Sequence, residues 1–502
     1  MNLEEKLGIR KENFMKSSQN TLEERTNFAV LLRKKKRIND IQNKRKQIKY
    51  QDDTKMFDPS VSNPIIRQIS TILDSLNSID QLVQSLVQIK ALCSSFNLSY
   101  LLEYPEIIKR LNLFTHLTYP DAASAIVMNL WAKVFAETTS VCKKAVTLIP
   151  ISSILHAMDT SKPRTAQKAY FCLGNLAGDC KDLRCLLLTE NALSYSLPIL
   201  MNSNDINIFR AAAFFYVHMT KEKDSINLKV FDEMMTALRQ QIFFNDEEVL
   251  SQGLYAIHNL ITEDEKKIER FMHFGMIEKL FELAELKSNS VSNAALKIVG
   301  DLAYAHFIEI NILIEKGLFD LLAKTVSLSS PTIRKESLYI ISNLVASGTP
   351  VLDQIVQHTL LEKIILSLKE RDKIILAECS YIYRNIAVVG NWTHFKVFLD
   401  FGVLVNLKDN LKFSEVEIAK NFLTFAEKLL FFAKENHAFS VFDDFSLTGC
   451  QENVEILQKH MNPVIYHKVT EILKYFVSNE EMSCEEDDLL DSNRDFNIKF
   501  NI

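Results

Sequence analysis

The sequence predicts an all-α solenoid, and three features of the 502-residue chain support this fold class. An aromatic residue followed four residues later by an asparagine recurs in FCLGN, YAIHN, YIISN and YIYRN, and these asparagines are 84, 84 and 42 residues apart. Glycine and proline number only 11 and 10, about 2% each against a usual 7% and 5%. Helical periodicity runs from about Pro64 to Phe476. A repeat of about 40 to 47 residues, with two or three helices per unit, is typical of HEAT or armadillo arrays.

A second signal with the same period predicts the turns between helices. Gly275, Gly317 and Gly402 occupy matching places in HFGMIEKL, EKGLFDLL and DFGVLVNL. Asn191 fills an earlier place in this series and Thr359 fills the missing one. Glycine and asparagine accept left-handed backbone angles, so we expect helix C-caps or inter-helix turns here.

The aromatic and asparagine positions predict a ladder of rings and amides on stacked helices. Residues at i and i+4 lie on one helix face, and each amide offers a donor and an acceptor to a peptide backbone. A single such pair is commonly a core ring beside a surface amide, whereas four in phase favour a groove for an extended peptide. The four aromatic and asparagine pairs are Phe171 and Asn175, Tyr255 and Asn259, Tyr339 and Asn343, and Tyr381 and Asn385. At the two positions between them where the period predicts a further pair, the chain has Phe214 with His218 and Lys297 with Asp301.

Several function classes find no support in the sequence. The glycines form no phosphate-binding loop, and the sequence contains neither G-x-S-x-G nor H-E-x-x-H. We therefore expect no enzyme, no catalytic residues, no cofactor and no metal site. Neither a secretory signal nor an apolar run of 18 residues is found, so we expect no membrane insertion. Cys142, Cys172 and Cys379 lie in apolar helical stretches and are predicted buried thiols, whereas Cys484 is predicted exposed, in a reducing compartment.

The two ends of the chain carry opposite charge. Residues 33–46, RKKKRINDIQNKRK, contain eight lysines or arginines, whereas residues 480–491, EEMSCEEDDLLD, contain seven acids. The basic block fits a nucleic-acid arm, a nuclear localisation signal, a basic helix for an acidic partner, or an ordinary solvated helix face. We predict a basic helical arm with its linker at 1–60, a solenoid of about nine to ten repeats at 61–478, and an acidic, disordered tail at 479–502.

Three segments, in this order along the chain, resemble the importin alpha family. TLEERTNFAVLLRKKKRINDIQNKRKQI resembles its importin-beta-binding segment, AYFCLGNLAGDCKDLRCLLL resembles its third armadillo repeat, and ENVEILQKHMNPVIYHKVTEILKYFVSNEE resembles its last repeat and acidic end. In the third repeat Phe171 replaces the family tryptophan, while Asn175 and Asp179 match. The resemblance covers nearly all of the chain. It implies a right-handed superhelical armadillo solenoid and an adaptor that carries basic nuclear localisation signals into the nucleus.

The resemblance also implies partners and site residues. Importin beta would bind an autoinhibitory arm, cargo would bind two grooves, an export receptor would bind the C-terminal repeat, and the protein would shuttle between cytoplasm and nucleus. The implied arm residues are Arg25, Arg33, Lys34, Lys36, Arg37, Lys44, Arg45 and Lys46. The implied N-terminal groove comprises Phe171, Asn175, Asp179, Phe214, His218, Tyr255 and Asn259. The implied C-terminal groove comprises Lys297, Asp301, Glu336, Tyr339, Asn343, Glu378, Tyr381 and Asn385.

The chain departs from the family most strongly in the N-terminal groove. Its second repeat, SAIVMNLWAKVFAETTS, is expected to place Leu130 and Val134 at the ring and amide positions, with Trp131 turned into the core. Lys143 is expected near the main lysine pocket, where it would repel a basic peptide. Glu336 and Glu378 precede their tyrosines by three residues and share a helix face with them. We therefore expect the C-terminal groove to bind at least as strongly as the N-terminal one.

Two other functions are weighed against transport. An armadillo scaffold for cytoskeletal or signalling partners would explain the ladder but would have no need of the basic arm. A nucleic-acid-binding solenoid would want a basic concave surface with stacking rings. Asp179, Asp301, Glu336 and Glu378 instead make the predicted groove acidic, so we expect no nucleic-acid partner.

Overall fold

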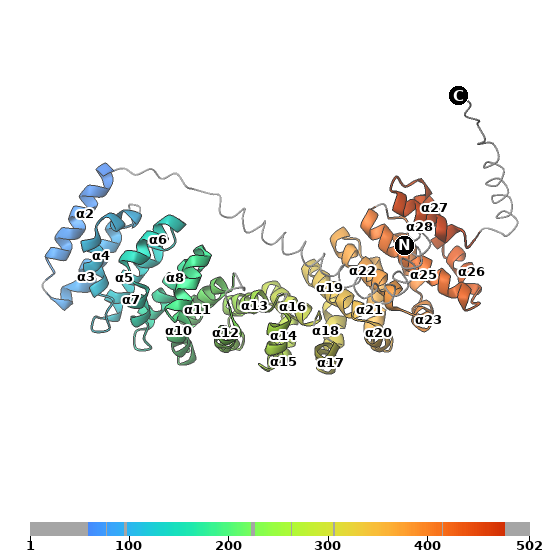
Figure 1. The fold of residues 1–502 in the computed structure, drawn as a ribbon, viewed down its shortest axis with the longest axis horizontal. Helices are drawn as coiled ribbons and strands as arrows, with labels where there is room; N and C mark the ends of the chain where they lie inside the picture. Colours follow the sequence, from blue (N-terminus) through green and yellow to red (C-terminus); the bar gives the residue numbers. More distant parts are fainter. Residues whose placement is uncertain are drawn as a thin grey trace, which may run out of the picture. The chain divides into compact units, whose positions relative to one another are not determined.

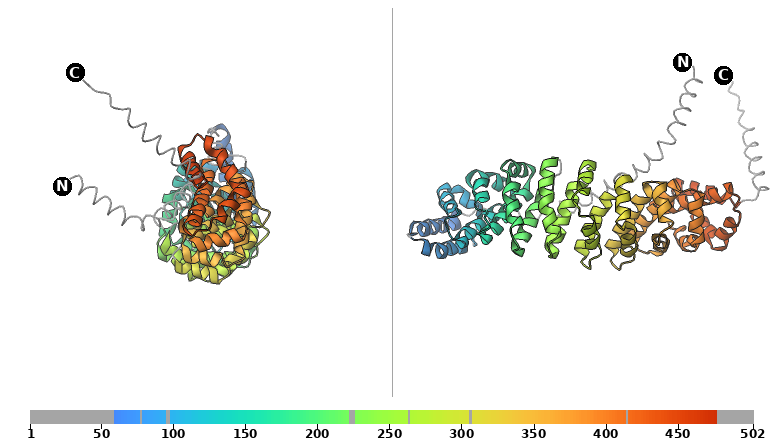
Figure 2. Two further views of the ribbon diagram at one scale, coloured as in Figure 1. Left: turned by 90° about the vertical axis from the view of Figure 1, so that its right-hand side faces the viewer. Right: turned by 90° about the horizontal axis from the view of Figure 1, so that it is seen from below.

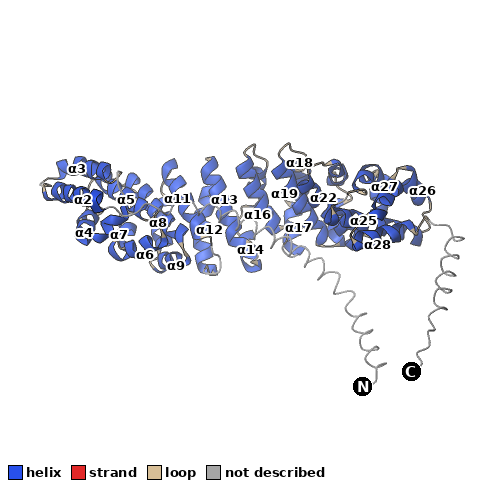
Figure 3. Ribbon diagram, turned by 90° about the horizontal axis from the view of Figure 1, so that it is seen from above, coloured by secondary structure: helices blue, strands red, loops and turns tan. Residues whose placement is uncertain are grey.

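The computed structural model describes residues 59–76, 78–94, 98–221, 226–262, 264–304, 307–413 and 415–476. Within these ranges all regular structure is helical, as the single helix colour in Figure 3 shows. Almost all of the predicted arm at 1–60, and the whole acidic tail at 479–502, lie outside the described residues. In the described part, no helix combines the length and the apolar character needed to cross a bilayer.

The described chain divides into two compact units, of which the first spans residues 59–304. Its α-helices are α2 (Pro59–Asp74), α3 (Ile79–Leu92), α4 (Pro105–Leu113), α5 (Asp121–Val134), α6 (Thr139–Leu148), α7 (Ile151–His156), α8 (Pro163–Asp179), α9 (Lys181–Thr189), α10 (Ala192–Met201), α11 (Ile206–Met219), α12 (Leu228–Ile242), α13 (Glu247–Ile261), α14 (Glu265–Met272), α15 (Ile277–Ala284) and α16 (Asn289–Leu302). A 3₁₀ helix, η1 (Leu98–Glu103), precedes α4.

The second unit spans residues 307–476. Its α-helices are α17 (Phe307–Glu315), α18 (Leu318–Thr325), α19 (Pro331–Ala346), α20 (Thr349–Ile355), α21 (Leu360–Leu366), α22 (Lys373–Val389), α23 (Trp392–Asp400), α24 (Val403–Leu407), α25 (Val416–Glu435), α26 (Ser440–Leu447), α27 (Cys450–Ile456) and α28 (Pro463–Leu473). Its 3₁₀ helices are η3 (Ser367–Lys369), η4 (Lys408–Asn410) and η5 (Leu457–Lys459).

One long helix per repeat packs against its counterpart in the next repeat, which makes each unit a helical solenoid. In the first unit α3, α5, α8, α11, α13 and α16 succeed one another in this way. In the second unit the series is α19, α22, α25 and α28. Figure 1 labels these helices, and the views in Figure 2 show the helices of each unit standing side by side. The predicted all-α solenoid is confirmed, and all of the predicted ladder residues lie on these long helices.

The predicted inter-helix turns are confirmed at all five positions, and four of the five have left-handed backbone angles. Asn191, Gly275, Gly317 and Gly402 have φ angles of 56°, 62°, 96° and 71°, in the left-handed region. Thr359 instead has φ −58° and lies in the right-handed helical region. A β-branched threonine is strongly disfavoured at positive φ, so this repeat makes its turn with ordinary helical angles.

The core confirms two side-chain predictions. Trp131 is fully buried, and the thiols of Cys142, Cys172 and Cys379 are buried too. Burial raises the pKa of the Cys142 thiol to about 12, which keeps it protonated at neutral pH. These groups serve packing, because each repeat buries one side of its helices against its neighbours.

Candidate functional site

The predicted ladder begins with a row of rings on α8 and α11. The Phe171 and Phe214 ring centroids are 5.7 Å apart, and those of Phe214 and His218 are 4.4 Å apart. The Phe214 and His218 rings lie over Gly174 and Gly178 of α8, where a Cβ atom would overlap them; at Gly178 it would be 2.5 Å from His218 Cδ2. The two glycines therefore let α11 bring its rings directly onto α8.

We expect Gly174→Ala to destabilise the protein by about 1–3 kcal/mol, because the added methyl group would force the Phe214 ring out of its place. Elsewhere in a helix the same change typically stabilises by about 0.5–1 kcal/mol. Urea denaturation midpoints measure the effect. The double variant Gly174→Ala/Phe214→Ala should cost less than the sum of its single variants. Simple additivity would contradict the contact.

The second repeat was predicted with an error of one residue. Leu130 and Val134 are fully buried, so they face the core and not the ladder. Asn129 is half-buried and Lys133 is exposed, and they lie 42 residues before Phe171 and Asn175. The ladder position of α5 therefore carries an amide and a lysine. A positive charge at this position would oppose the binding of a basic peptide, and the sequence analysis assigned such a charge to Lys143, not to Lys133.

Asn175 and Asp179 lie beside groups of the preceding repeat. The Asn175 amide donates to the Ala132 carbonyl at 2.7 Å. One oxygen of Asp179 accepts from the Thr139 hydroxyl at 2.9 Å, while the other, Oδ2, is buried without a hydrogen-bond partner among the described residues. A buried oxygen of this kind is costly to leave without a hydrogen-bond partner.

Lys143 does not act as a free repulsive charge. Its ammonium group lies 2.6 Å from Asp182, and both side chains are largely exposed. A hydrogen bond from Lys143 lowers the pKa of Asp182, so the carboxylate stays ionised beside the lysine. The predicted repulsion at Lys143 is therefore largely compensated by its partner.

Further along the first unit, α13 and α16 bring the next ladder residues together. The Lys297 ammonium lies 5.7 Å from the centre of the Tyr255 ring, and the Asn259 amide donates to the Thr220 hydroxyl at 3.2 Å. Asp301 is 6% exposed and interacts with His258. Lys297 and Asp301, which we expected in the C-terminal groove, thus belong to the first unit.

Sequence reasoning missed the polar cluster around Asp301. Its Oδ2 lies 2.6 Å from His258 Nδ1 and accepts from the Thr262 hydroxyl at 2.7 Å. In the sequence His258 is a lone histidine on a helix, which gives no reason to pair it with an acid. The available signal was the 43-residue separation of His258 and Asp301, which matches the repeat length.

The second unit brings together the other six predicted residues. Glu336, Tyr339 and Asn343 lie on α19 and are 5%, 7% and 3% exposed. The corresponding residues on the adjacent helix are Glu378, Tyr381 and Asn385. The Asn385 amide donates to the Ser342 carbonyl at 2.8 Å, which ties α22 to α19. Carboxylate, ring and amide thus recur at the same spacing on two packed helices.

Asn343 differs from the other ladder asparagines. Its amide nitrogen and its carbonyl oxygen are both buried and have no hydrogen-bond partner among the described residues. Asn175, Asn259 and Asn385 each donate to the preceding repeat. Unpaired buried polar atoms cost about 1–3 kcal/mol each. Asn343 is therefore a position where a bound backbone would recover free energy.

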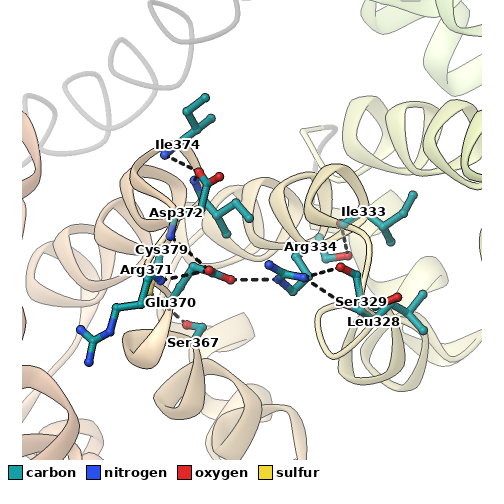
Figure 4. A network of polar contacts seen from close by, with 12 residues as sticks. Leu328, Ser329, Ile333, Arg334, Ser367, Glu370, Arg371, Asp372, Ile374 and Cys379 are labelled. Atoms are coloured by element: carbon teal, nitrogen blue, oxygen red, sulfur yellow. Dashed lines mark hydrogen bonds and ion pairs between the residues drawn. The ribbon is translucent and has the colours of Figure 1, made fainter.

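A half-buried ion pair between Arg334 and Glu370 lies beside the helices that carry these residues (Figure 4). Arg334 donates to Glu370 at 2.9 Å and to the carbonyl oxygens of Leu328 and Ser329 at 3.1 and 2.8 Å. Burial opposes ionisation of Glu370, but the bonds from Arg334 and from two backbone N–H groups prevail and lower its pKa. The pair stays charged at neutral pH and holds the start of α19 against the loop before α22.

The predicted arm cannot be located in the structure, and the search for a metal site gave no candidate among the described residues. The arm residues Arg25, Arg33, Lys34, Lys36, Arg37, Lys44, Arg45 and Lys46 lie outside the described residues. Across the described ranges, no cluster of three histidine, cysteine or acidic side chains could hold a metal ion.

Comparison with known proteins shows similarity to importin alpha subunits, whereas no family model matches the chain. The chain is 29% identical over 136 residues to Importin subunit alpha-1b of Oryza sativa subsp. japonica, covering 27% of this chain and 26% of that protein. It is 24% identical over 312 residues to Importin subunit alpha-4 of Arabidopsis thaliana, covering 61% and 57%. The matches thus span about a quarter and somewhat over half of these relatives' lengths.

Among solved structures, the chain is similar to an engineered protein of the Northeast Structural Genomics Consortium, target OR497. The TM-score is 0.65 at 15% identity, and the match covers 82% of this chain and 99% of that chain. At this identity the likeness concerns the fold alone. The importin alpha matches confirm the family resemblance that the sequence motifs indicated.

Proposed function

We propose that this chain, a divergent member of the importin alpha family, is a nuclear import adaptor that binds basic segments of cargo proteins. Its ladder would hold the cargo peptide extended. Its N-terminal arm, residues 20–48, would recruit importin beta, and its C-terminal repeat would bind an export receptor. The protein would then shuttle between cytoplasm and nucleus through the nuclear pore.

The observation that carries the proposal is the repeated set of carboxylate, tyrosine and asparagine on α19 and α22. An extended peptide needs hydrogen-bond partners for its backbone, which amides provide. A lysine or arginine side chain has an apolar stem and a charged head. A ring that contacts the stem and an acid that meets the head therefore suit it, and a cation over a ring adds roughly 0.5–2 kcal/mol.

A pulldown with two baits tests the adaptor function. Importin beta and a basic signal peptide are each immobilised and offered the full chain or the chain without residues 1–60. We expect importin beta to retain only the full chain, and the peptide to retain both forms. Failure of the full chain to bind either bait would reject the transport function.

Deleting residues 1–60 should also raise the affinity for a basic peptide. Lys44, Arg45 and Lys46 form a basic cluster on the same chain as the groove, and a short flexible tether gives an effective concentration near the millimolar range. The cluster would therefore compete with cargo that binds at micromolar concentration. Fluorescence anisotropy with a labelled peptide measures the difference, and equal affinities would show that the arm does not occupy the groove.

The competing function is an armadillo scaffold that binds extended peptides without a transport role. Lys133 at a ladder position and Lys297 over Tyr255 favour it, because both place a positive charge where a basic cargo would lie. A scaffold of this kind would bind neutral or acidic peptides and ignore importin beta. The same two-bait experiment, extended with a neutral peptide of equal length, separates the two functions.

A further inference from the structure

The second unit contains a cavity between the loop that leads into α22 and the loop, one repeat later, that leads into α25. Its volume is about 540 Å³, within the range of about 300–1,000 Å³ that is typical of ligand pockets. Three basic side chains line it, Arg371, Lys373 and Lys412, and the side chains of Leu376 and Phe413 add apolar surface. A segment that is both acidic and apolar would complement this lining.

The acids of the lining balance only part of this positive charge. Glu370 forms the ion pair with Arg334 at 2.9 Å, so its charge is already offset by a residue that does not line the cavity. Asp409 lies 3.1 Å from Lys412 and 3.6 Å from Arg371. Figure 4 shows Arg371 pointing away from the Arg334 and Glu370 pair. One carboxylate thus serves two of the three basic groups, and the cavity keeps an excess of positive charge.

Lys373 is the least compensated of the three basic groups. Its ammonium lies 5.9 Å from the centre of the Phe413 ring, and no acid of the described chain forms an ion pair with it. It occupies the first position of α22, at the positive end of the helix dipole, where a cation is disfavoured. The adjacent Asp372 caps the helix by accepting from the backbone N–H groups of Ile374 and Ile375. The charge of Lys373 therefore has no local stabilising role and suits an anion that comes from elsewhere.

A segment with the matching chemistry follows α28 in the same chain. Residues 485–491 read EEDDLLD, in which four consecutive acids precede two leucines. The segment lies outside the described residues and begins nine residues after Phe476, with which the described chain ends. Its acids match the basic side chains of the cavity, and its leucines match the apolar surface of Leu376 and Phe413.

The connection after Phe476 is long enough to bring this segment to the cavity. Because α28 packs on α25 and α25 on α22, two interhelix steps of about 8–10 Å each separate α28 from α22. The 20 residues of α25 measure about 30 Å at about 1.5 Å per residue, which bounds the displacement along the helix axes. The span is therefore about 35 Å. Nine to twelve extended residues cover roughly 30–43 Å, so the acids at 485–488 can reach the cavity.

We propose that residues 485–491 of this chain dock in this cavity, with their acids on its three basic side chains and their leucines against Leu376 and Phe413. Exposed ion pairs are individually weak, so the contact depends on the tether. A short flexible tether gives an effective concentration near the millimolar range, at which a weak site is occupied. The contact is independent of the binding of basic cargo and gives the acidic tail a place on the second unit.

Photo-crosslinking within the full chain tests the contact. Leu489 is replaced by the photoreactive benzoylphenylalanine, and the irradiated chain is digested and its crosslinked peptides are identified by mass spectrometry. We expect crosslinks to peptides that contain Leu376 or Phe413. Crosslinks that are absent, or that are spread along the solenoid with no preference for these peptides, would overturn the proposal.

Two charge-reversed chains with the same photoreactive residue separate the cavity from net charge. Arg371→Glu/Lys373→Glu/Lys412→Glu should lower the yield of the cavity crosslinks at least tenfold. The matched control reverses three exposed lysines of the first unit, Lys229, Lys266 and Lys287, and should leave the yield unchanged. An equal loss in both variants would show a general effect of charge and would overturn the proposal.

A labelled peptide of residues 480–491 gives a second test that leaves every described residue in place. Its affinity is measured by fluorescence anisotropy at low salt for the natural chain and for Glu485→Gln/Glu486→Gln/Asp487→Asn/Asp488→Asn. We expect the neutralised chain to bind the peptide at least tenfold more tightly, because its own tail no longer competes for the cavity. Equal affinities would overturn the proposal and would identify the cavity as a site for an acidic segment of another protein. Absence of binding to either chain would overturn it as well.

Discussion

We expect the combined substitution of Arg33, Lys34 and Lys36 by glutamate to abolish the binding of importin beta. These residues belong to the basic block at 33–46, which contains eight lysines or arginines and one aspartate. If the arm binds an acidic surface, three reversals change the net charge of the contact by six and turn attraction into repulsion. Surface plasmon resonance with immobilised importin beta measures the loss, which should exceed 100-fold.

Ionic strength and a matched variant serve as controls for the arm. Contacts between exposed charges are screened over about 8–10 Å at physiological salt, so binding of the unaltered chain should weaken steeply as salt rises. Reversing three exposed lysines of the solenoid, Lys287, Lys369 and Lys459, changes the net charge of the chain equally and should leave importin beta binding intact. An unaltered affinity after the arm reversal would remove the main support for transport.

The second large effect is expected from the ladder of the second unit. Asn343→Ala/Asn385→Ala should lower the affinity for a single-cluster basic peptide by about 10- to 100-fold. Each lost hydrogen bond to the peptide contributes roughly 0.5–1.5 kcal/mol, and 1.4 kcal/mol corresponds to a factor of ten. Asn175→Ala/Asp179→Lys should cost less than about threefold, because the neighbouring rings of the first unit are closed on one another. Titrations use chain without residues 1–60, so that the arm cannot compete.

Two further amide substitutions test whether the ladder position itself matters. Asn202 and Asn436 are exposed, and each donates to a carbonyl of its own helix, so Asn202→Ala/Asn436→Ala should leave peptide affinity unchanged. Thermal melts confirm that each double variant is folded, which matters because Asn385 also ties α22 to α19. If the Asn175 and Asp179 variant loses most of the affinity and the other loses little, the N-terminal groove is the functional one.

The sequence alone determined the repeat length and those features that depend only on the residues of a single helix or turn. The 42-residue period, the all-α class and the long helices that carry the ladder follow from patterns that act within one helix. The left-handed turns at Gly317 and Gly402 were predictable because a missing Cβ acts on a residue's own backbone. Trp131 was correctly placed in the core for the same kind of reason, from its position on a single helix face.

The main error came from a position where one residue of register mattered. Leu130 and Val134 were assigned to the ladder, but one residue along a helix is a rotation of about 100°. That rotation separates the buried Leu130 from the half-buried Asn129. Thr359 filled the correct place in the period but could not adopt the left-handed angle, so the turn was made differently.

Tertiary structure decided which ladder side chains pair with other residues of the described chain and which buried polar atoms are left without a partner there. Phe214 and His218 reach Gly174 and Gly178, His258 reaches Asp301, and Lys143 reaches Asp182, each across about one repeat. Such pairings depend on how two helices about 40 residues apart are stacked, and no local pattern encodes that distance. The unpaired amide of Asn343 is of the same kind. An asparagine in phase is visible in the sequence, but whether its hydrogen bonds are already made depends on the neighbouring repeat.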